Sequence, residues 1–117
     1  MAERSIFKIF RIGEWQAFAE SGSFAGSPDD LRDGFIHLSY AEQVSGTLAR
    51  HYASEAEIVL AAFDERAFGP ELRAEASRGS ALFPHLHGVL GRRALLRSER
   101  LGRGPAGFAL PDWCKDA

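Results

Sequence analysis

Six consecutive apolar residues, from Ile58 to Phe63, constrain the fold more than any other feature of the sequence. The run reads IVLAAF, and Glu57 and Asp64 bound it with charge on both sides. A short apolar run without alternation predicts a strand that is covered on both faces. We therefore expect a central strand with other elements packed on its two sides.

The residues before this run predict a strand and two short helical segments. Residues 5–12 favour a strand because β-branched and aromatic side chains alternate with other residues there. Residues 13–22 have apolar side chains at helical spacing and end in a glycine, which predicts a short amphipathic helix. Ser27 at an N-cap position and Pro28 after it predict a helical turn that ends at residues 33–34.

A second strand and a longer helix are expected next. Residues 35–39 read FIHLS and predict a strand. Ser39 and Glu42 have the spacing of a capping box, so we expect Ser39 to begin a helix that runs to Tyr52.

After Asp64, glycine and proline interrupt the pattern repeatedly. We expect strands at residues 72–76 and 93–101 and a short strand at residues 108–110. The FPHLHG segment, residues 83–88, is expected to form a loop. This order of elements, with strands predominating in the second half, predicts an α+β domain.

Length and composition predict a single compact domain over residues 1–117. A chain of 117 residues leaves little room for a second core, and its 45% hydrophobic residues suffice to build one. The net charge of −2 gives no general attraction to nucleic acid or to an anionic membrane, so neither is an expected partner. A single cysteine, Cys114, excludes an intramolecular disulfide. Because no signal-peptide or transmembrane pattern is present, we expect a cytoplasmic protein, of open oligomeric state.

One local stretch is basic although the whole chain is slightly acidic. Five arginines lie between residues 92 and 103, with Glu99 as the only acid among them. Charge runs of this kind are mostly solvated surface. The alternative function is attraction of a phosphate-bearing ligand, which requires that the stretch face a cleft.

A histidine in the middle of the predicted strand at residues 35–39 marks a candidate site. Strand alternation puts Phe35, His37 and Ser39 on one face and the two apolar residues between them on the other. One face therefore belongs to the core, and the other carries chemistry or a cleft. The alternative is structural: a packed, hydrogen-bonded imidazole at His37 and a helix cap at Ser39.

Two further histidines, His85 and His87, project to the same side if their segment is extended. If they converge with His37, three imidazoles face one cleft. Such a set could bind zinc, copper or iron, but the spacing is not diagnostic of a metal site, and a cleft for a non-metal ligand is favoured. His51 ends the predicted helix, where an interaction with the helix dipole accounts for it.

Several common catalytic motifs are missing from the sequence. It contains no serine-hydrolase elbow, no phosphate-binding glycine loop and no H-E-x-x-H motif. Ser39 lies two residues from His37, but no third residue is placed to orient the histidine, so the pair is not a catalytic triad.

The segments DGFIHLSYAEQV and FPHLHG resemble a bacterial family known as domain of unknown function 952. The resemblance spans nearly the whole chain: IFKI near the start, Asp33 to Gln43 in the middle, Glu75, and then Phe83 to Gly88. The family pattern has tyrosine where this chain has His87.

Members of that family in turn look like compact versions of the ADP-ribosyltransferase fold. FIHLS resembles its second motif, in the histidine form found in the tRNA 2′-phosphotransferases. The resemblance implies a mixed sheet with a few short helices. It places His37 on the histidine of the motif and Lys8 near the polar residue of the first motif. Glu75 corresponds to the third catalytic position by its order in the chain alone.

The first functional hypothesis is therefore an enzyme that acts on NAD, as a substrate, or on another ADP-ribosyl-type ligand. The resemblance implies catalytic roles for His37, Lys8 and Glu75. His37 would hydrogen-bond a ribose hydroxyl, and Lys8 or a nearby arginine would meet a phosphate oxygen. The residues expected to bind the ligand are Ser39, Gln43, Tyr52, Phe35, Phe83, His85 and His87.

Two other hypotheses remain open. The second is a module that binds a nucleotide or small metabolite in the same cleft without turnover, which the insecure third catalytic position favours. The third and weakest is a metal-dependent enzyme that uses His37, His85 and His87.

Overall fold

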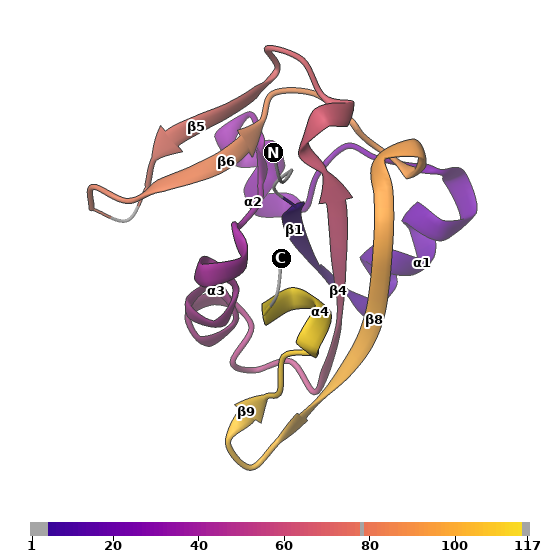
Figure 1. Ribbon diagram of the computed structural model, residues 1–117. Coiled ribbons are helices and arrows are strands. Elements are labelled where there is room, and N and C mark those ends of the chain that lie inside the picture. Colours follow the sequence, from indigo (N-terminus) through magenta and orange to yellow (C-terminus); the bar gives the residue numbers. More distant parts are fainter. Residues whose placement is uncertain (1–4, 78, 116–117) are drawn as a thin grey trace.

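The computed structural model describes residues 5–77 and 79–115. No helix among these residues is long and apolar enough to cross a membrane. The element order confirms an α+β domain with a few short helices (Figure 1). The helices are α1 (Ile12–Ser21), α2 (Pro28–Asp33), α3 (Val44–His51) and α4 (Asp112–Lys115), with 3-10 turns η1 (Ala41–Gln43), η2 (Glu65–Ala67) and η3 (Arg92–Ala94). The strands are β1 (Ser5–Arg11), β2 (Ser23–Phe24), β3 (Ile36–His37), β4 (Glu57–Asp64), β5 (Leu72–Ala76), β6 (Leu82–Leu86), β7 (Leu90–Gly91), β8 (Leu95–Gly104) and β9 (Gly107–Phe108).

β4 lies in the interior of the larger sheet, as its uninterrupted apolar sequence predicts. Its neighbours are β1 and β8, and the strand order is β1-β4-β8-β9 (Figure 1). All six residues from Ile58 to Phe63 are buried. Side chains from α1 pack on one face of β4, and side chains from α3 and α4 pack on the other. The prediction of a strand covered on both faces is confirmed.

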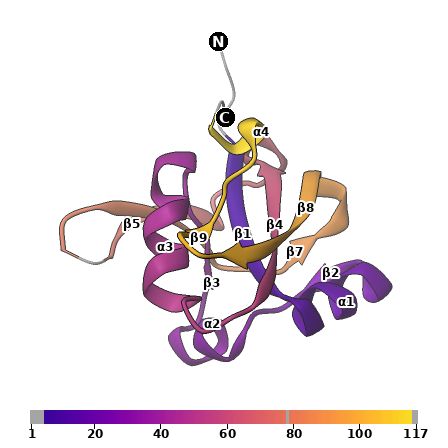
Figure 2. The ribbon, with the colours of Figure 1, turned by 90° about the horizontal axis from the view of Figure 1, so that it is seen from below.

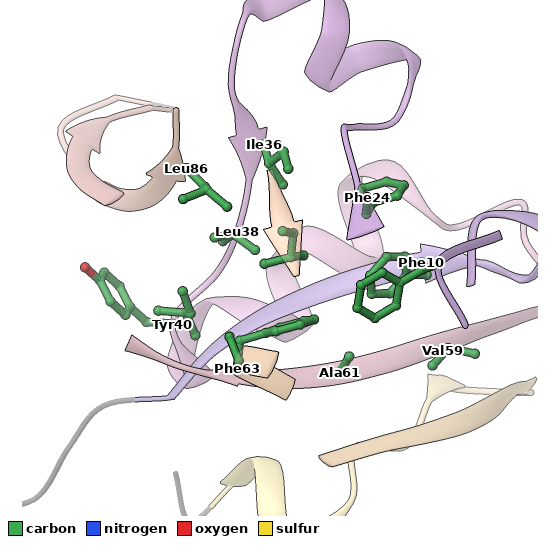
Figure 3. Close-up of a cluster of buried hydrophobic side chains, with 13 residues drawn as sticks. Phe10, Phe24, Ile36, Leu38, Tyr40, Val59, Ala61, Phe63 and Leu86 are labelled. Carbon is green, nitrogen blue, oxygen red and sulfur yellow. The ribbon is translucent and has the colours of Figure 1, made fainter. Parts of the chain in front are cut away.

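Alternation along β1 divides the buried side chains into two clusters. Phe10 packs in the α1 cluster, with ring centroids 5.4 Å from Phe18 and 5.0 Å from Phe24. Phe7 and Ile9 point to the opposite side and pack in the α3 cluster. Figure 3 shows the α1 cluster, which also contains Ile36 of β3, Leu38 just beyond β3 and Leu86 of β6.

β2 and β7 pair as a separate two-stranded sheet. A three-stranded sheet, called the smaller sheet below, has the order β3-β6-β5 and is bridged to the larger sheet by one residue pair among the described residues. Phe7 of β1 and Ser39, just beyond β3, exchange two backbone hydrogen bonds of 2.8 and 2.9 Å. The five strands β4, β1, β3, β6 and β5 therefore follow one another in a curled antiparallel surface. The expectation of a mixed sheet is wrong for the described residues, because every strand pair there is antiparallel. The connecting segments reverse the chain direction instead of forming parallel crossovers.

The end of α1 and both ends of α2 lie where the sequence predicts. α1 ends at Gly22, whose φ of +80° is the left-handed conformation that glycine adopts without strain. Ser27 is the N-cap of α2. Its hydroxyl oxygen accepts a hydrogen bond from the N–H of Asp30, and the Asp30 carboxylate accepts one from the N–H of Ser27. Gly34 ends this helix with a φ of +86°.

The start of the third helical segment differs from the prediction. Ser39 does not cap it, because its backbone is already part of the bridge to Phe7. Instead its hydroxyl lies 3.1 Å from the hydroxyl of Thr47. The chain turns into η1 after Tyr40, whose N–H donates to Gln43 Oε1 at 3.0 Å, and α3 follows.

Three strand boundaries also differ from the prediction. The FPHLHG segment is not a loop, because residues 82–86 form β6 between β3 and β5. Pro84 lacks a donor, but its carbonyl accepts the N–H of Leu38 at 3.0 Å, which keeps it within the sheet. β8 begins at Leu95 because the residues before it form η3, and β9 covers residues 107–108 instead of 108–110.

Candidate functional site: a cleft between β1, α2 and α3

A cleft with a volume of about 240 Å³ opens where the two sheets meet. Phe7 and Ser39, the two residues of the bridge, both line it. The other walls come from β1, α2, β3, α3 and β6. Figure 2 shows α2 and α3 close to β3 and β1 in this part of the molecule. The cleft therefore collects side chains from segments that are far apart in the sequence.

Asp30 is the central side chain of this site. It is buried, and its Oδ2 accepts hydrogen bonds from Lys8 Nζ at 2.9 Å and from the N–H of Ser27 at 2.8 Å. Its Oδ1 accepts the N–H of His37 at 3.0 Å and lies 2.7 Å from His37 Nδ1. Burial alone would raise the pKa of Asp30, but the hydrogen bond from His37 and the charge of Lys8 outweigh burial and hold this pKa well below its usual range. An ionised carboxylate thus connects β1, α2 and β3.

His37 stands at the cleft with both ring nitrogens close to carboxylates. Its Nδ1 lies 2.7 Å from Asp30 Oδ1, and its Nε2 lies 3.0 Å from Asp33 Oδ2. A ring nitrogen that carries a proton donates to the carboxylate oxygen beside it. The side chain is 36% exposed and lines the cleft. His37 therefore occupies the outward face of its strand, as the alternation predicts, and is oriented by two carboxylates.

Lys8 is buried next to His37 and forms a hydrogen bond with its backbone. Its side chain is only 3% exposed, and its ammonium donates to Asp30 Oδ2 and, at 3.0 Å, to the carbonyl oxygen of His37. The Nζ atom also lies 5.7 Å from the ring centroid of Phe24. Although Lys8 lines the cleft, two of its three possible donors are occupied by the protein itself.

Three imidazoles surround the ring of Phe35. The centroid of this ring lies 4.7 Å from that of His37, 4.1 Å from that of His85 and 5.2 Å from that of His87. The rings of His37 and His85 are 5.6 Å apart. The three histidines therefore gather around Phe35, but only His37 and His85 line the cleft.

Glu75 of β5 fixes two of these histidines. Its Oε1 lies 2.9 Å from His85 Nδ1 and 2.8 Å from His87 Nε2. Hydrogen bonds from His87 and His85 lower the pKa of Glu75. Burial lowers the pKa of His85, although the hydrogen bond with Glu75 opposes this shift. His85 and His87 thus lie on the same side of the extended segment, as predicted.

The structure brings six of the ten predicted site residues to the cleft wall and leaves four outside it. Glu75 stands behind the imidazole of His85, and Gln43 donates from Nε2 to the carbonyl of Leu82 at 2.7 Å. The arginines of residues 92–103 do not line the cleft. The residues at the wall are Lys8, His37, Ser39, Tyr52, Phe83 and His85, and those outside are Phe35, Gln43, Glu75 and His87.

Sequence reasoning missed the acidic and basic residues that complete the cleft. Asp30 and Asp33 belong to a helical turn whose sequence is fully explained by capping, so nothing marked them as partners of a histidine. Arg11 and Arg50 also line the cleft. No local pattern of the sequence distinguishes these two arginines from other surface arginines.

Within residues 5–77 and 79–115, no group of three or more His, Cys, Asp or Glu side chains is arranged to hold a metal ion. The convergent histidines bind carboxylates instead: His37 contacts Asp30 and Asp33, and His85 and His87 share Glu75. The hypothesis of a three-histidine metal enzyme therefore receives no geometric support from the part of the chain that the structure describes.

Comparison with known proteins places the chain in a family. Residues 9–98 match the model described as "Protein of unknown function (DUF952)". The chain belongs to the DUF952 family. Two solved structures of protein CC0527 from Caulobacter crescentus are similar to it. A crystal structure of CC0527 is 40% identical, with 95% of this chain and 98% of that chain covered and a TM-score of 0.88. A solution NMR structure is 41% identical, with 89% and 90% covered and a TM-score of 0.79.

No curated protein matches this DUF952 chain. The description of the family assigns no activity to its members.

Proposed function

We propose that this DUF952 protein binds a nucleotide-type ligand, NAD or another ADP-ribosyl compound, in the His37 cleft and transfers its ADP-ribosyl-type group. The observation that carries the proposal is His37 itself. Its imidazole lies at an open cleft and is held by carboxylates at both nitrogens, 2.7 and 3.0 Å away. A fixed polar group at the mouth of a concave site is the arrangement that orients a polar ligand.

The contact between Lys8 and His37 supports the resemblance to ADP-ribosyltransferases. That resemblance assigns polar roles to one residue of an early strand and one residue of a second strand. In this chain Lys8 of β1 donates to the carbonyl of His37 at 3.0 Å, so the two motif positions adjoin at one cleft. Because Lys8 is buried against Asp30, its role in the proposal is to position His37.

Arginine side chains supply the positive charge that a phosphate needs. Lys8, Arg11, Arg32 and Arg50 line the cleft together with the carboxylates of α2. Arg11 is paired with Glu55 at 3.1 Å, and Arg32 is paired with the carboxylates of α2. Arg50 is the candidate for binding a phosphate, since a guanidinium can contact two phosphate oxygens at once.

The proposed reaction requires positioning more than it requires a protein nucleophile. The bond between the anomeric carbon of the ribose and its leaving nitrogen breaks, and the electron pair departs with nicotinamide. An acceptor hydroxyl forms the new bond to the anomeric carbon and releases its proton. Positive charge develops on the ribose in the transition state, and oriented dipoles and carboxylates stabilise it.

The position of Glu75 favours a second function, binding without turnover. The resemblance assigns the third catalytic position to Glu75, yet this carboxylate lies outside the cleft wall and contacts His85 and His87. The two carboxylates nearest His37 are already occupied by its ring nitrogens. A cleft of this kind suits a module that senses a nucleotide.

A thermal-shift screen with NAD, ADP-ribose and AMP, followed by an assay for nicotinamide release, tests the proposal. A ligand at about 100 times its Kd stabilises the folded state by about 2.7 kcal/mol, which raises the melting temperature by several degrees. We expect this shift in the wild type and its loss in His37→Asn, while Arg93→Gln, outside the cleft, behaves as wild type. Binding without nicotinamide release would select the sensing module. A melt that no nucleotide shifts contradicts both functions.

A further inference from the structure

A second, shallow hollow that is more open to solvent lies beside the cleft, between α3 and the β5–β6 hairpin. Arg50 and Phe83 line both hollows. Figures 1 and 2 show the hairpin extending outward past α3. Gln43, next to α3, fastens the two elements by donating to the carbonyl of Leu82 in the hairpin at 2.7 Å. The two hollows are therefore neighbours with a shared wall.

The size of the first cleft indicates that a dinucleotide-type ligand does not fit inside it completely. Sites for small molecules and cofactors enclose about 300 to 1,000 Å³. The His37 cleft, at about 240 Å³, falls below this range. A ligand of two nucleoside-sized halves would place one half there and the other on the adjoining surface.

Arg50 lines both hollows, and in the part of the chain that the structure describes its guanidinium is free to bind an anionic ligand. Its side chain is exposed at the end of α3, and no ion pair or hydrogen bond engages it among the described residues. Arg11 and Arg32, the other two arginines of the cleft, are paired with carboxylates at 3.1 and 3.0 Å. A phosphate that joins two halves of a ligand would lie beside Arg50.

Gly46 lines the second hollow and contributes no side chain to it. It lies within α3, where glycine destabilises a helix relative to alanine. A Cβ atom at this position would meet nothing within 4 Å, so no packing contact in the described chain requires glycine. A glycine on the wall of a hollow allows another group to approach the backbone closely.

We infer that the second hollow is the subsite for the other half of a two-part ligand whose bridging phosphate is held by Arg50. The inference rests on the proposed function of the His37 cleft and names its ligand class. Dinucleotide-type molecules, with two nucleoside-sized halves joined through phosphate, fit the pair of hollows, and mononucleotides occupy only the first.

Filling the second hollow tests this inference. Gly46→Phe adds a ring at a residue that lines the second hollow, where a Cβ atom meets nothing within 4 Å, and Ala49→Phe adds the same ring at an exposed position of α3 that lines neither hollow. We expect Gly46→Phe to weaken ADP-ribose binding at least tenfold in calorimetric titration and to leave AMP binding unchanged. Ala49→Phe should change neither affinity. Arg50→Gln should weaken both ligands, since each carries a phosphate.

The outcomes separate the inference from the proposed function. If nucleotides bind but Gly46→Phe retains wild-type affinity for ADP-ribose, the inference is overturned and the proposed function stands. Inorganic pyrophosphate gives a probe independent of nucleosides, through the backbone amide shifts of residues 45–50. If pyrophosphate moves these amides in the wild type and not in Arg50→Gln, while no nucleotide binds, the proposed function fails and the anion site at Arg50 stands. If neither probe binds, both are overturned.

Discussion

The carboxylate of Asp30 connects three segments that are far apart in the sequence. Its two oxygens accept from Lys8 in β1, from Ser27 before α2 and from His37 in β3. Each contact satisfies a donor that is buried or partly buried, and an unsatisfied group there would cost about 1–3 kcal/mol. The orientation of His37 at the cleft is thus a result of the same interactions that hold the fold together.

Asp30→Asn should destabilise the protein strongly. An amide keeps one acceptor oxygen but removes the charge that compensates the buried ammonium of Lys8. Loss of one partner of a buried ion pair costs about 3–5 kcal/mol. Urea unfolding monitored by circular dichroism measures the free energy of unfolding. Asp29→Asn is the matched control on the same helix, because that side chain is 59% exposed, and it should cost less than about 1 kcal/mol. Equal losses for the two variants would contradict this role of Asp30.

The sequence predicts the role of His37 at this site but not the role of Asp30, and the difference has a physical reason. His37 is recognisable because a polar residue interrupts an apolar strand pattern. Asp30 is not recognisable as a site residue, because helix capping alone already explains an acidic residue near the start of a helix. Its second role, as partner of Lys8 and His37, depends on contacts across 22 and 7 residues of sequence, which local patterns do not encode.

At the scale of elements, the predictions succeed where local signals dominate. β4 follows from its apolar run, and α2 follows from the Ser27 cap and the glycine that ends it. β6 was missed because Pro84 disfavours a strand, while its pairing with β3 and β5 depends on long-range contacts. The start of α3 was misplaced because the bridge to Phe7 engages the backbone of Ser39.

Gly46→Ala should stabilise the protein. The position is helical, and the added methyl group meets nothing within 4 Å, so the gain in helix propensity of about 0.5–1 kcal/mol is not opposed by a clash. Gly34→Ala is the matched comparison, since its Cβ also meets nothing within 4 Å but its φ is +86°. That substitution should destabilise by about 1–2 kcal/mol, since the left-handed conformation disfavours a side chain. Thermal unfolding of both variants measures the difference, and shifts of the same sign would refute the explanation.

At the scale of the whole molecule, two hydrophobic clusters lie on opposite faces of β1 and β4, and the cleft opens at the seam between the two sheets. The polar network of Asp30 and the histidine cluster around Phe35 both lie beside this seam. Global stability therefore depends on the protonation of groups that line the candidate site.

The free energy of unfolding should fall as the pH is lowered from about 7 to 5. Burial lowers the pKa of folded His85 below the unfolded value of about 6.5, so in this range the unfolded state binds more protons than the folded state. Glu75, His87 and His37 are the titratable groups around it. Asp30 adds a second loss at more acidic pH, because its folded pKa is depressed and its stabilising charge disappears only below the unfolded value of about 3.9.

Denaturant titrations at a series of pH values measure this dependence. His85→Gln should flatten the slope between pH 7 and 5, whereas His51→Gln, at the exposed end of α3, should retain it. A wild-type stability that is constant over this range would contradict the assignment.

Because Asp30 accepts hydrogen bonds from several residues, it also limits which substitutions this sequence can accumulate during evolution. A carboxylate that serves Lys8, Ser27 and His37 at once has no equivalent among the other side chains, since only a charged acceptor of this length reaches all three. Loss of the lysine leaves the buried carboxylate without its cation, and loss of the aspartate leaves the buried ammonium without its anion. Neutral substitution of either member of this ion pair is therefore blocked, and descendants of this chain must keep Lys8 and Asp30 or replace both together.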